Sequence, residues 1–192
     1  MRLVYFITHP DVVIDPAVPV PQWSLSERGK ERMKALLTKP WMPTIGSVYC
    51  STEQKAMDGA KILADYLGLA YEMVKDLGEI DRSSTGYLPH DQHAATAHKF
   101  FAYPDRSILG WETAQAAQQR IVKALDSLVE KDKGSLNIAL VSHGAVATLY
   151  LCHLKGRQIS EKEGQPGASG GNYYCFEAKS KSLLHGWQQI DG

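Results

Sequence analysis

The sequence contains few cysteines. Only three occur among its 192 residues, Cys50, Cys152 and Cys175, and no two of them form a CxxC pair. An odd number of cysteines fits no closed disulfide framework. We therefore expect three reduced and mostly buried cysteines, as in a protein of the cytoplasm.

The sequence also has no excess of charge and no long apolar run. Lys and Arg number 21, as do Asp and Glu, so the formal net charge is zero. Generic binding to nucleic acid needs a basic surface, so we expect no nucleic-acid partner. No segment approaches the roughly 18 apolar residues of a membrane span, and the apolar residues 3–7 are too few for a signal peptide. We expect a soluble, cytoplasmic protein without a membrane partner.

The composition is that of an ordinary globular protein, with 44% hydrophobic and 22% charged residues. A chain of this length can bury a core without disulfides or metals, and it corresponds to about one domain. We expect a single domain over residues 1–192. The proline-rich residues 15–21 and the glycine-rich residues 164–171 are interpreted as surface loops of that domain.

Two apolar runs, residues 3–7 and residues 136–141 (apolar except for Asn137), predict strands buried on both faces, as in a parallel sheet. Residues 111–129 carry apolar side chains at spacings of three and four, which predicts an amphipathic helix. Strands that alternate with helices predict an α/β fold with a mostly parallel sheet. The other expected strands are residues 48–51, 69–74, 173–176 and 183–188, and the other expected helices are residues 27–37 (with Ser24 or Ser26 as N-cap), 53–67, 92–101 and 145–154.

Polar side chains follow the ends of these strands. His9 follows the first strand and His143 follows the strand over residues 136–141, while Ser51, Lys55 and Glu79 come after the second and third strands. In open α/β sheets, ligands bind beyond the carboxyl ends of the strands. If the two histidine-bearing strands are neighbours, both imidazoles lie in one crevice together with a lysine and a carboxylate.

Five segments occur in the order in which one enzyme family has them. Thr8-His9-Pro10 is similar to an Arg-His-Gly motif, Leu25–Gly29 to a Leu-Thr-x-x-Gly helix start, and Leu77-Gly78-Glu79 to Leu-x-Glu. Residues 49–60 are similar to a Ser-Ser-x-x-x-Arg-Ala-x-x-Thr-Ala segment, and Ser142-His143-Gly144 is similar to a second histidine motif. Over nearly its whole length the chain resembles the histidine phosphatases, or phosphoglycerate mutase-like superfamily, which implies a three-layer sandwich of helices around the sheet.

The resemblance implies a mechanism without metal or other cofactor. His9 would attack phosphorus and form a phosphohistidine, which requires a neutral ring whose other nitrogen donates to a carbonyl. Glu79 would protonate the leaving oxygen and then accept a proton from water. His143 would stabilise charge on the phosphate oxygens. The implied ligand is a small phosphorylated substrate or an oxyanion, and a homodimer is compatible with this interpretation.

Four residues depart from the family pattern. Thr8 and Lys55 stand where the family has arginines, Pro10 replaces a glycine, and Asp15 falls where many members have a phosphate-binding asparagine. Lysine supplies a point charge and threonine one hydroxyl in place of a guanidinium fork. The loss of one preorganised donor costs about 3–4 kcal/mol of transition-state stabilisation. We take Thr8, Lys55 and Asp15 as the phosphate-binding positions; Asp15 equally fits a role in bracing the proline-rich loop.

Other residues carry weaker signals. Arg28, Arg82 or Arg106 would compensate for the missing arginines if one of them reaches the pocket, and otherwise they are surface charges. His90, His93 and His98 have a spacing that invites a metal interpretation, but solvated side chains explain them better. Ser169-Gly170-Gly171 resembles a phosphate cradle without the strand and helix that such a cradle needs. Several aromatic residues, such as Trp23 and Tyr87, fit a lid or ordinary packing.

The leading hypothesis is a phosphatase-type hydrolase that cleaves a small phosphomonoester, with His9, Glu79 and His143 as catalytic residues. The alternative is a catalytically degenerate member of the same fold that binds a ligand or a partner, because the phosphate pocket departs from the pattern at four positions. A third interpretation keeps the enzyme but gives it a less charged or a cationic substrate. A mutase is disfavoured because the chain lacks the additional arginines that would hold a second anionic group.

Overall fold

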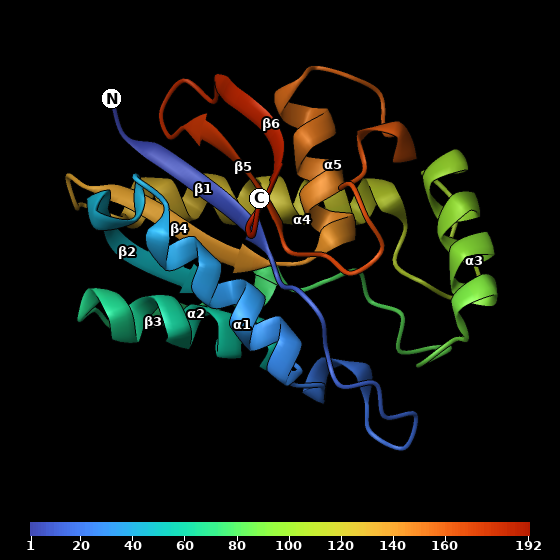
Figure 1. Ribbon diagram of the computed structural model, residues 1–192. Coiled ribbons are helices and arrows are strands. Elements are labelled where there is room, and N and C mark those ends of the chain that lie inside the picture. Colours follow the sequence, from blue (N-terminus) through green and yellow to red (C-terminus); the bar gives the residue numbers. More distant parts are fainter.

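The computed structural model describes residues 1–192 and contains a six-stranded sheet with helices on both faces (Figure 1). The strand order is β3-β2-β4-β1-β5-β6. The pairs of β1 with β4, of β2 with β4 and of β2 with β3 are parallel, whereas β5 and β6 add an antiparallel hairpin at one edge. The strands are β1 (Leu3–Thr8), β2 (Ile45–Cys50), β3 (Tyr71–Met73), β4 (Asn137–Ser142), β5 (Asn172–Glu177) and β6 (Leu183–Gln189).

Five α-helices connect the strands. They are α1 (Glu27–Ala35), α2 (Gln54–Leu67), α3 (His90–Ala102), α4 (Ala114–Lys131) and α5 (Gly144–Leu154). Short 3₁₀ turns occupy Val20–Gln22, Leu36–Thr38, Met42–Thr44, Lys75–Leu77 and Glu161–Glu163. No helix has the combination of length and hydrophobicity that crossing a membrane requires.

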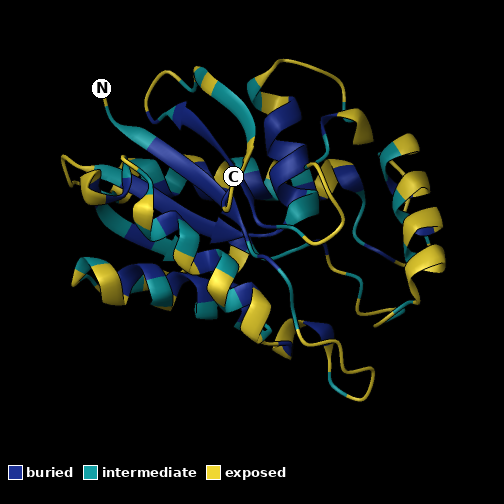
Figure 2. Cartoon of the chain, in the orientation of Figure 1, coloured by how far each residue is buried: buried dark blue, intermediate teal, exposed yellow.

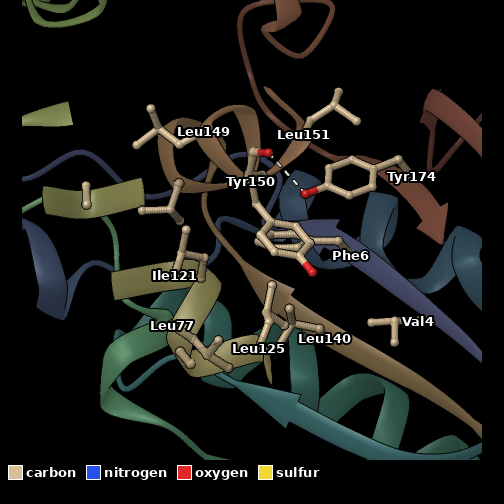
Figure 3. Packing of buried hydrophobic residues seen from close by; sticks show 14 of the residues in the cluster. Val4, Phe6, Leu77, Ile121, Leu125, Leu140, Leu149, Tyr150, Leu151 and Tyr174 are labelled. Carbon is tan, nitrogen blue, oxygen red and sulfur yellow. Dashed lines mark hydrogen bonds between the residues drawn. The ribbon is translucent and has the colours of Figure 1, made fainter. Parts of the chain in front are cut away.

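The sheet separates two hydrophobic clusters, because successive side chains of a strand point to opposite faces. Val4 and Phe6 of β1 belong to the cluster under α4 and α5, whereas Tyr5 and Ile7 belong to the cluster under α1 and α2. Figure 3 shows Phe6 and Tyr150 packed together in the first of these clusters, with ring centroids 6.2 Å apart. The predicted α/β fold with a three-layer, mostly parallel architecture is therefore confirmed.

The element boundaries follow local capping chemistry. The hydroxyl of Ser26, not that of Ser24, accepts a hydrogen bond from the Gly29 amide at 3.1 Å and starts α1. Helix α4 begins at Ala114, three residues later than predicted, because the Thr113 side chain caps it. The third strand is only Tyr71–Met73, shorter than the predicted residues 69–74.

The burial of the three cysteines and the exposure of the proline-rich segment agree with the predictions from the sequence. Cys50, Cys152 and Cys175 are buried and form no disulfide. Residues 15–21 form a largely exposed loop after β1 (Figure 2). The Trp23 indole N–H lies 2.9 Å from each of two carbonyls of this loop, those of Asp15 and Val18, and fixes the loop against the molecule.

We predict that Gly29→Ala destabilises the protein by about 1–3 kcal/mol, because helix α1 packs closely against the chain that follows His9. A Cβ atom at Gly29 would lie 2.1 Å from the Asp11 carbonyl oxygen, so α1 or the backbone would have to move. Urea unfolding measures the effect. Gly186→Ala is the matched control, since nothing lies within 4 Å of a Cβ there. Equal unfolding midpoints for both variants would contradict the packing argument.

Candidate active site

Two histidines meet at the carboxyl ends of the central strands. Strands β1 and β4 pair in register up to Thr8 and Ser142, so the next residues, His9 and His143, lie side by side. Their ring centroids are 5.2 Å apart, with the planes at 67°. The structure therefore brings together the two imidazoles expected from the sequence.

The hydrogen bonding of His9 leaves one ring nitrogen free. Nδ1 lies 2.9 Å from the Pro10 carbonyl oxygen and must donate to it, because a carbonyl can only accept. Nε2 is then the unprotonated nitrogen of the neutral ring. Burial lowers the pKa of His9 to about 4, and the positive charge of Lys55 adds to this shift. At neutral pH His9 is thus a neutral imidazole with a free lone pair on Nε2.

His143 is fully buried and lacks one hydrogen-bond partner. Its Nε2 lies 2.6 Å from the Ser51 hydroxyl, which also accepts from the Glu53 amide; because a hydroxyl has one proton and two lone pairs, it can either donate to Nε2 or accept from it. Nδ1 of His143 is buried and has no hydrogen-bond partner. Burial lowers the pKa of His143 well below its usual value, although the charge of Glu53 opposes this. A buried ring nitrogen without a partner is rare in folded proteins, so Nδ1 is a position where a ligand atom would be satisfied.

Glu53 is a site residue that the sequence interpretation missed. One carboxylate oxygen accepts from the Glu79 amide at 2.8 Å and lies 3.4 Å from Nε2 of His143; the other is 2.5 Å from the Lys55 ammonium. Burial alone would raise the pKa of Glu53, but the Lys55 ammonium and the Glu79 amide favour the charged carboxylate and hold the pKa of Glu53 below its usual value. The pocket therefore contains a permanent negative charge.

Lys55 is held in place by two partners. Its side chain is buried, and its ammonium donates to the Val20 carbonyl at 2.9 Å and to Glu53. Most of its positive charge is balanced by the Glu53 carboxylate. Lys55 therefore does not replace the paired donors of an arginine at this position.

Glu79 joins the cluster from the loop after the third strand. Its carboxylate accepts from the amides of Ile80, Ala145 and Val146 at 3.0–3.1 Å, the last two at the start of helix α5. Burial raises the pKa of Glu79, and the nearby Glu53 charge raises it further, while the amide donors act in the opposite direction. The net effect favours the protonated form that a general acid needs.

Thr8 and Asp15 are not brought to this cluster. Thr8 is fully buried, and its hydroxyl lies 2.7 Å from the Gln165 side-chain oxygen and accepts from the Asn172 amide at 3.0 Å. Gln165, not Thr8, lines the cavity beside His9. Asp15 is exposed, and its carboxylate accepts from the Ala17 amide at 2.9 Å within the proline-rich loop. The bracing role considered for Asp15 matches this position.

Arg82 is the one arginine of the three candidates that reaches the cluster. It lines both cavities described below and forms no ion pair, whereas exposed Arg28 lies 3.7 Å from Asp11. The guanidinium of Arg106 instead lies 5.2 Å from the centre of the Tyr103 ring. The charge of Arg82 contributes to the lowered pKa values of His9 and His143.

Two cavities meet at seven shared residues, which include His9, Glu79 and Arg82 as well as Trp23 and Tyr87. The first, about 580 Å³, extends toward α3 and α5 and is lined by aromatic side chains that include Trp23, Tyr87, Phe100, Phe101 and Trp111. The second, about 1080 Å³, extends toward α2 and the proline-rich loop and is lined mostly by polar and charged residues. Both volumes are in the range of small-molecule sites.

The remaining candidates have other surroundings. His93 lies 5.6 Å from the Trp111 ring, His98 contacts Glu161 at 2.8 Å, and no three His, Cys, Asp or Glu side chains are arranged to hold a metal ion. The Gly171 amide donates to the His9 carbonyl at 3.2 Å, and a Cβ at Gly170 would lie 2.2 Å from that oxygen. The glycine-rich loop thus packs on the backbone of His9.

We predict that part of the acid sensitivity of the fold comes from His9. Its pKa is about 4 in the folded protein and about 6.5 in an unfolded chain, so between these values only the unfolded chain binds the proton. The free energy of unfolding therefore falls as the pH drops from 7 to 5, with about 1–2 kcal/mol due to His9. In urea unfolding, His9→Gln should lose less stability over this interval than the wild type. The exposed-site control His153→Gln should behave like the wild type, and equal losses in all three proteins would contradict the assignment.

Comparisons with known proteins identify the family of this chain. The chain matches the model of the histidine phosphatase superfamily (branch 1) over residues 19–172, a region that contains Glu79 and His143 and begins after His9. No curated protein matches the sequence.

Similar solved structures include mycobacterial glucosyl-3-phosphoglycerate phosphatase in complex with inorganic phosphate, at 17% identity and TM-score 0.78, covering 100% of both chains. They also include Bacillus stearothermophilus YhfR, at 19% identity and TM-score 0.74, covering 97% of this chain and 95% of that one. A putative alpha-ribazole-5'-P phosphatase from Escherichia coli is 19% identical with TM-score 0.74, covering 99% and 98%. At such identities the similarity shows the fold. The family match, which spans well over half of the sequence, shows that the chain belongs to the histidine phosphatase superfamily.

Proposed function

We propose that the protein is a phosphatase-type hydrolase that cleaves a small phosphomonoester through a phosphohistidine on His9. The observation that carries this proposal is the pair of imidazoles. His9 presents a free Nε2 on a neutral ring, and the adjacent His143 has a buried Nδ1 without a hydrogen-bond partner. His9 supplies the nucleophile, and His143 in the tautomer that carries its proton on Nδ1 supplies a donor for a phosphate oxygen.

In the first step, Nε2 of His9 attacks phosphorus and the bond to the leaving oxygen breaks. Protonated Glu79 transfers its proton to that oxygen, and its raised pKa supports this role. The Pro10 carbonyl accepts from Nδ1 and stabilises the positive charge that develops on the ring. In the second step, Glu79 accepts a proton from the attacking water, and cleavage of the phosphorus–nitrogen bond restores His9.

Arg82 is the group that we propose to neutralise the phosphate charge. It has no ion-pair partner and lies where the two cavities meet, as a phosphate ligand requires. Lys55 contributes a point charge weakened by Glu53. Thr8 influences the cavity only through its hydrogen bond to Gln165, which lines the cavity beside His9. We assign no phosphate contact to Asp15.

We predict that a chromogenic phosphomonoester produces a phosphoenzyme that is stable in alkali and labile in acid, and that His9→Ala abolishes both the phosphoenzyme and turnover. The reason is that the free Nε2 of His9 is the nucleophile of the proposed first step. Rapid quench with radiolabelled substrate measures the adduct, with His153→Ala as an exposed-site control. Turnover that persists in His9→Ala would contradict the mechanism.

The alternative is a ligand-binding or partner-binding member of the family without turnover. Glu53 is the observation that favours it, because a permanent carboxylate in the pocket opposes a phosphate dianion. Tungstate separates the two roles in combination with the quench experiment. Tungstate bound between His9 and His143 together with a phosphoenzyme supports hydrolysis, whereas an occluded pocket and no adduct support the binding role.

We predict that Arg82→Met lowers kcat/KM for a phosphomonoester by about 10²–10³, because it removes the unpaired cation that lines both cavities together with His9. Steady-state kinetics measures the loss. Arg106→Met is the matched control, since that guanidinium packs on Tyr103 away from the cavities, and its kcat/KM should stay within about twofold. An unchanged kcat/KM in Arg82→Met would remove Arg82 from the site.

A further inference from the structure

The charges around the site fit a substrate with one negative charge. The four basic side chains that line the larger cavity are matched by four acidic ones in addition to Glu79. Two of these four cations are already neutralised in ion pairs, because Lys55 is paired with Glu53 and Arg120 with Glu112. Both histidines are neutral at pH 7. A phosphate dianion would therefore meet the free guanidinium of Arg82 and the fixed Glu53 carboxylate, while the unpaired Lys75 ammonium lies on an exposed part of the cavity wall.

Glu53 is not available to bind a substrate cation. Both of its oxygens have partners within the protein, the Glu79 amide and the Lys55 ammonium, and its side chain is mostly buried. Its charge therefore acts on the substrate as a repulsion that grows with the negative charge of the phosphate group. Among phosphoesters, this favours a monoanion over a dianion.

The shape of the site points to two organic groups around the phosphorus. The two cavities share seven lining residues, among them His9, Glu79 and Arg82. From these the smaller cavity extends toward α3 and α5, and the larger one extends toward the proline-rich loop, the loop over residues 75–87 and the start of α2 (Figure 1 shows α5 and α2 on different sides of the sheet). Each cavity is large enough for an organic substituent. The aromatic wall of the smaller cavity fits a planar apolar group. A monoester fills only one cavity, whereas a diester fills both.

We propose that this site hydrolyses phosphodiesters and prefers them to phosphomonoesters, with one ester group in each cavity and a planar group in the aromatic one. The inference rests on the proposed function, because it uses the same nucleophile. Nε2 of His9 attacks phosphorus, one ester bond breaks, and Glu79 protonates the departing alcohol. The intermediate is a phosphate monoester bound to His9. Water then gives a proton to Glu79, and its oxygen replaces His9 on phosphorus, which releases a phosphomonoester.

Three probes with the same leaving group test the proposal at pH 8, where the monoester is a dianion because its second pKa is roughly 6. They are p-nitrophenyl phosphate, methyl p-nitrophenyl phosphate and bis(p-nitrophenyl) phosphate. We expect kcat/KM to rise in this order, with at least about tenfold between the first and the last. The methyl diester separates the effect of charge from that of filling the second cavity. Faster cleavage of the monoester than of both diesters would overturn the proposal.

Glu53→Gln tests the cause of the preference. The variant removes the negative charge with little change in shape, so it should raise the monoester-to-diester ratio of kcat/KM by about tenfold, while the exposed-site control Glu31→Gln leaves the ratio unchanged. An unchanged ratio in a folded Glu53→Gln would overturn the charge argument.

Wild-type enzyme provides a second measurement. Lowering the pH from 8 to 5.5 protonates the monoester and should raise its rate of cleavage relative to that of the diesters. A constant ratio of the two rates would count against the proposal.

The two proposals fail in different ways. Cleavage of any of the probes that survives in His9→Ala, or no cleavage of any probe, contradicts the proposed function. Cleavage of the monoester that depends on His9, without cleavage of the diesters, overturns only the preference for diesters.

Discussion

The site depends on the parallel pairing of β1 with β4. Their register ends at Thr8 opposite Ser142, and the His9 amide donates to the Ser142 carbonyl at 3.1 Å. A shift of one residue would turn the side chains of a strand to the opposite face, so the buried residues on both faces of β1 also fix where the imidazole of His9 lies. The hydrophobic core thus sets the spacing of two rings that carry no hydrophobic function.

A second constraint is the electrostatic balance around Glu53. One carboxylate orders Lys55, the backbone of Glu79 and the surroundings of His143, and it also cancels much of the positive charge that a phosphate site needs. Burial keeps both histidines neutral, which suits a nucleophile but adds no charge. Arg82 therefore becomes the main source of attraction for an anion, and it comes from a loop that the family motifs do not include.

Much of the fold and the two histidines could be predicted from the sequence, because apolar runs mark buried strands and each histidine follows such a run after one polar residue, Thr8 or Ser142. The remaining site residues depend on tertiary contacts. Glu53 occupies a variable position of the motif that it belongs to, and only folding brings it to Lys55, His143 and the Glu79 amide. Gln165 reaches Thr8 from 157 positions away, which no local pattern reveals. For Asp15, spacing from His9 suggested a phosphate contact, but the proline-rich loop places its side chain in solvent.

The burial of Thr8 has an evolutionary consequence. Its hydroxyl is enclosed by Gln165 and Asn172, and no open surface surrounds it. A guanidinium at this position would have to displace the Gln165 amide before it met any ligand, so a lone codon change toward the family's arginine would damage packing without a compensating gain. An arginine at this position therefore requires at least two coordinated replacements, one of them at Gln165.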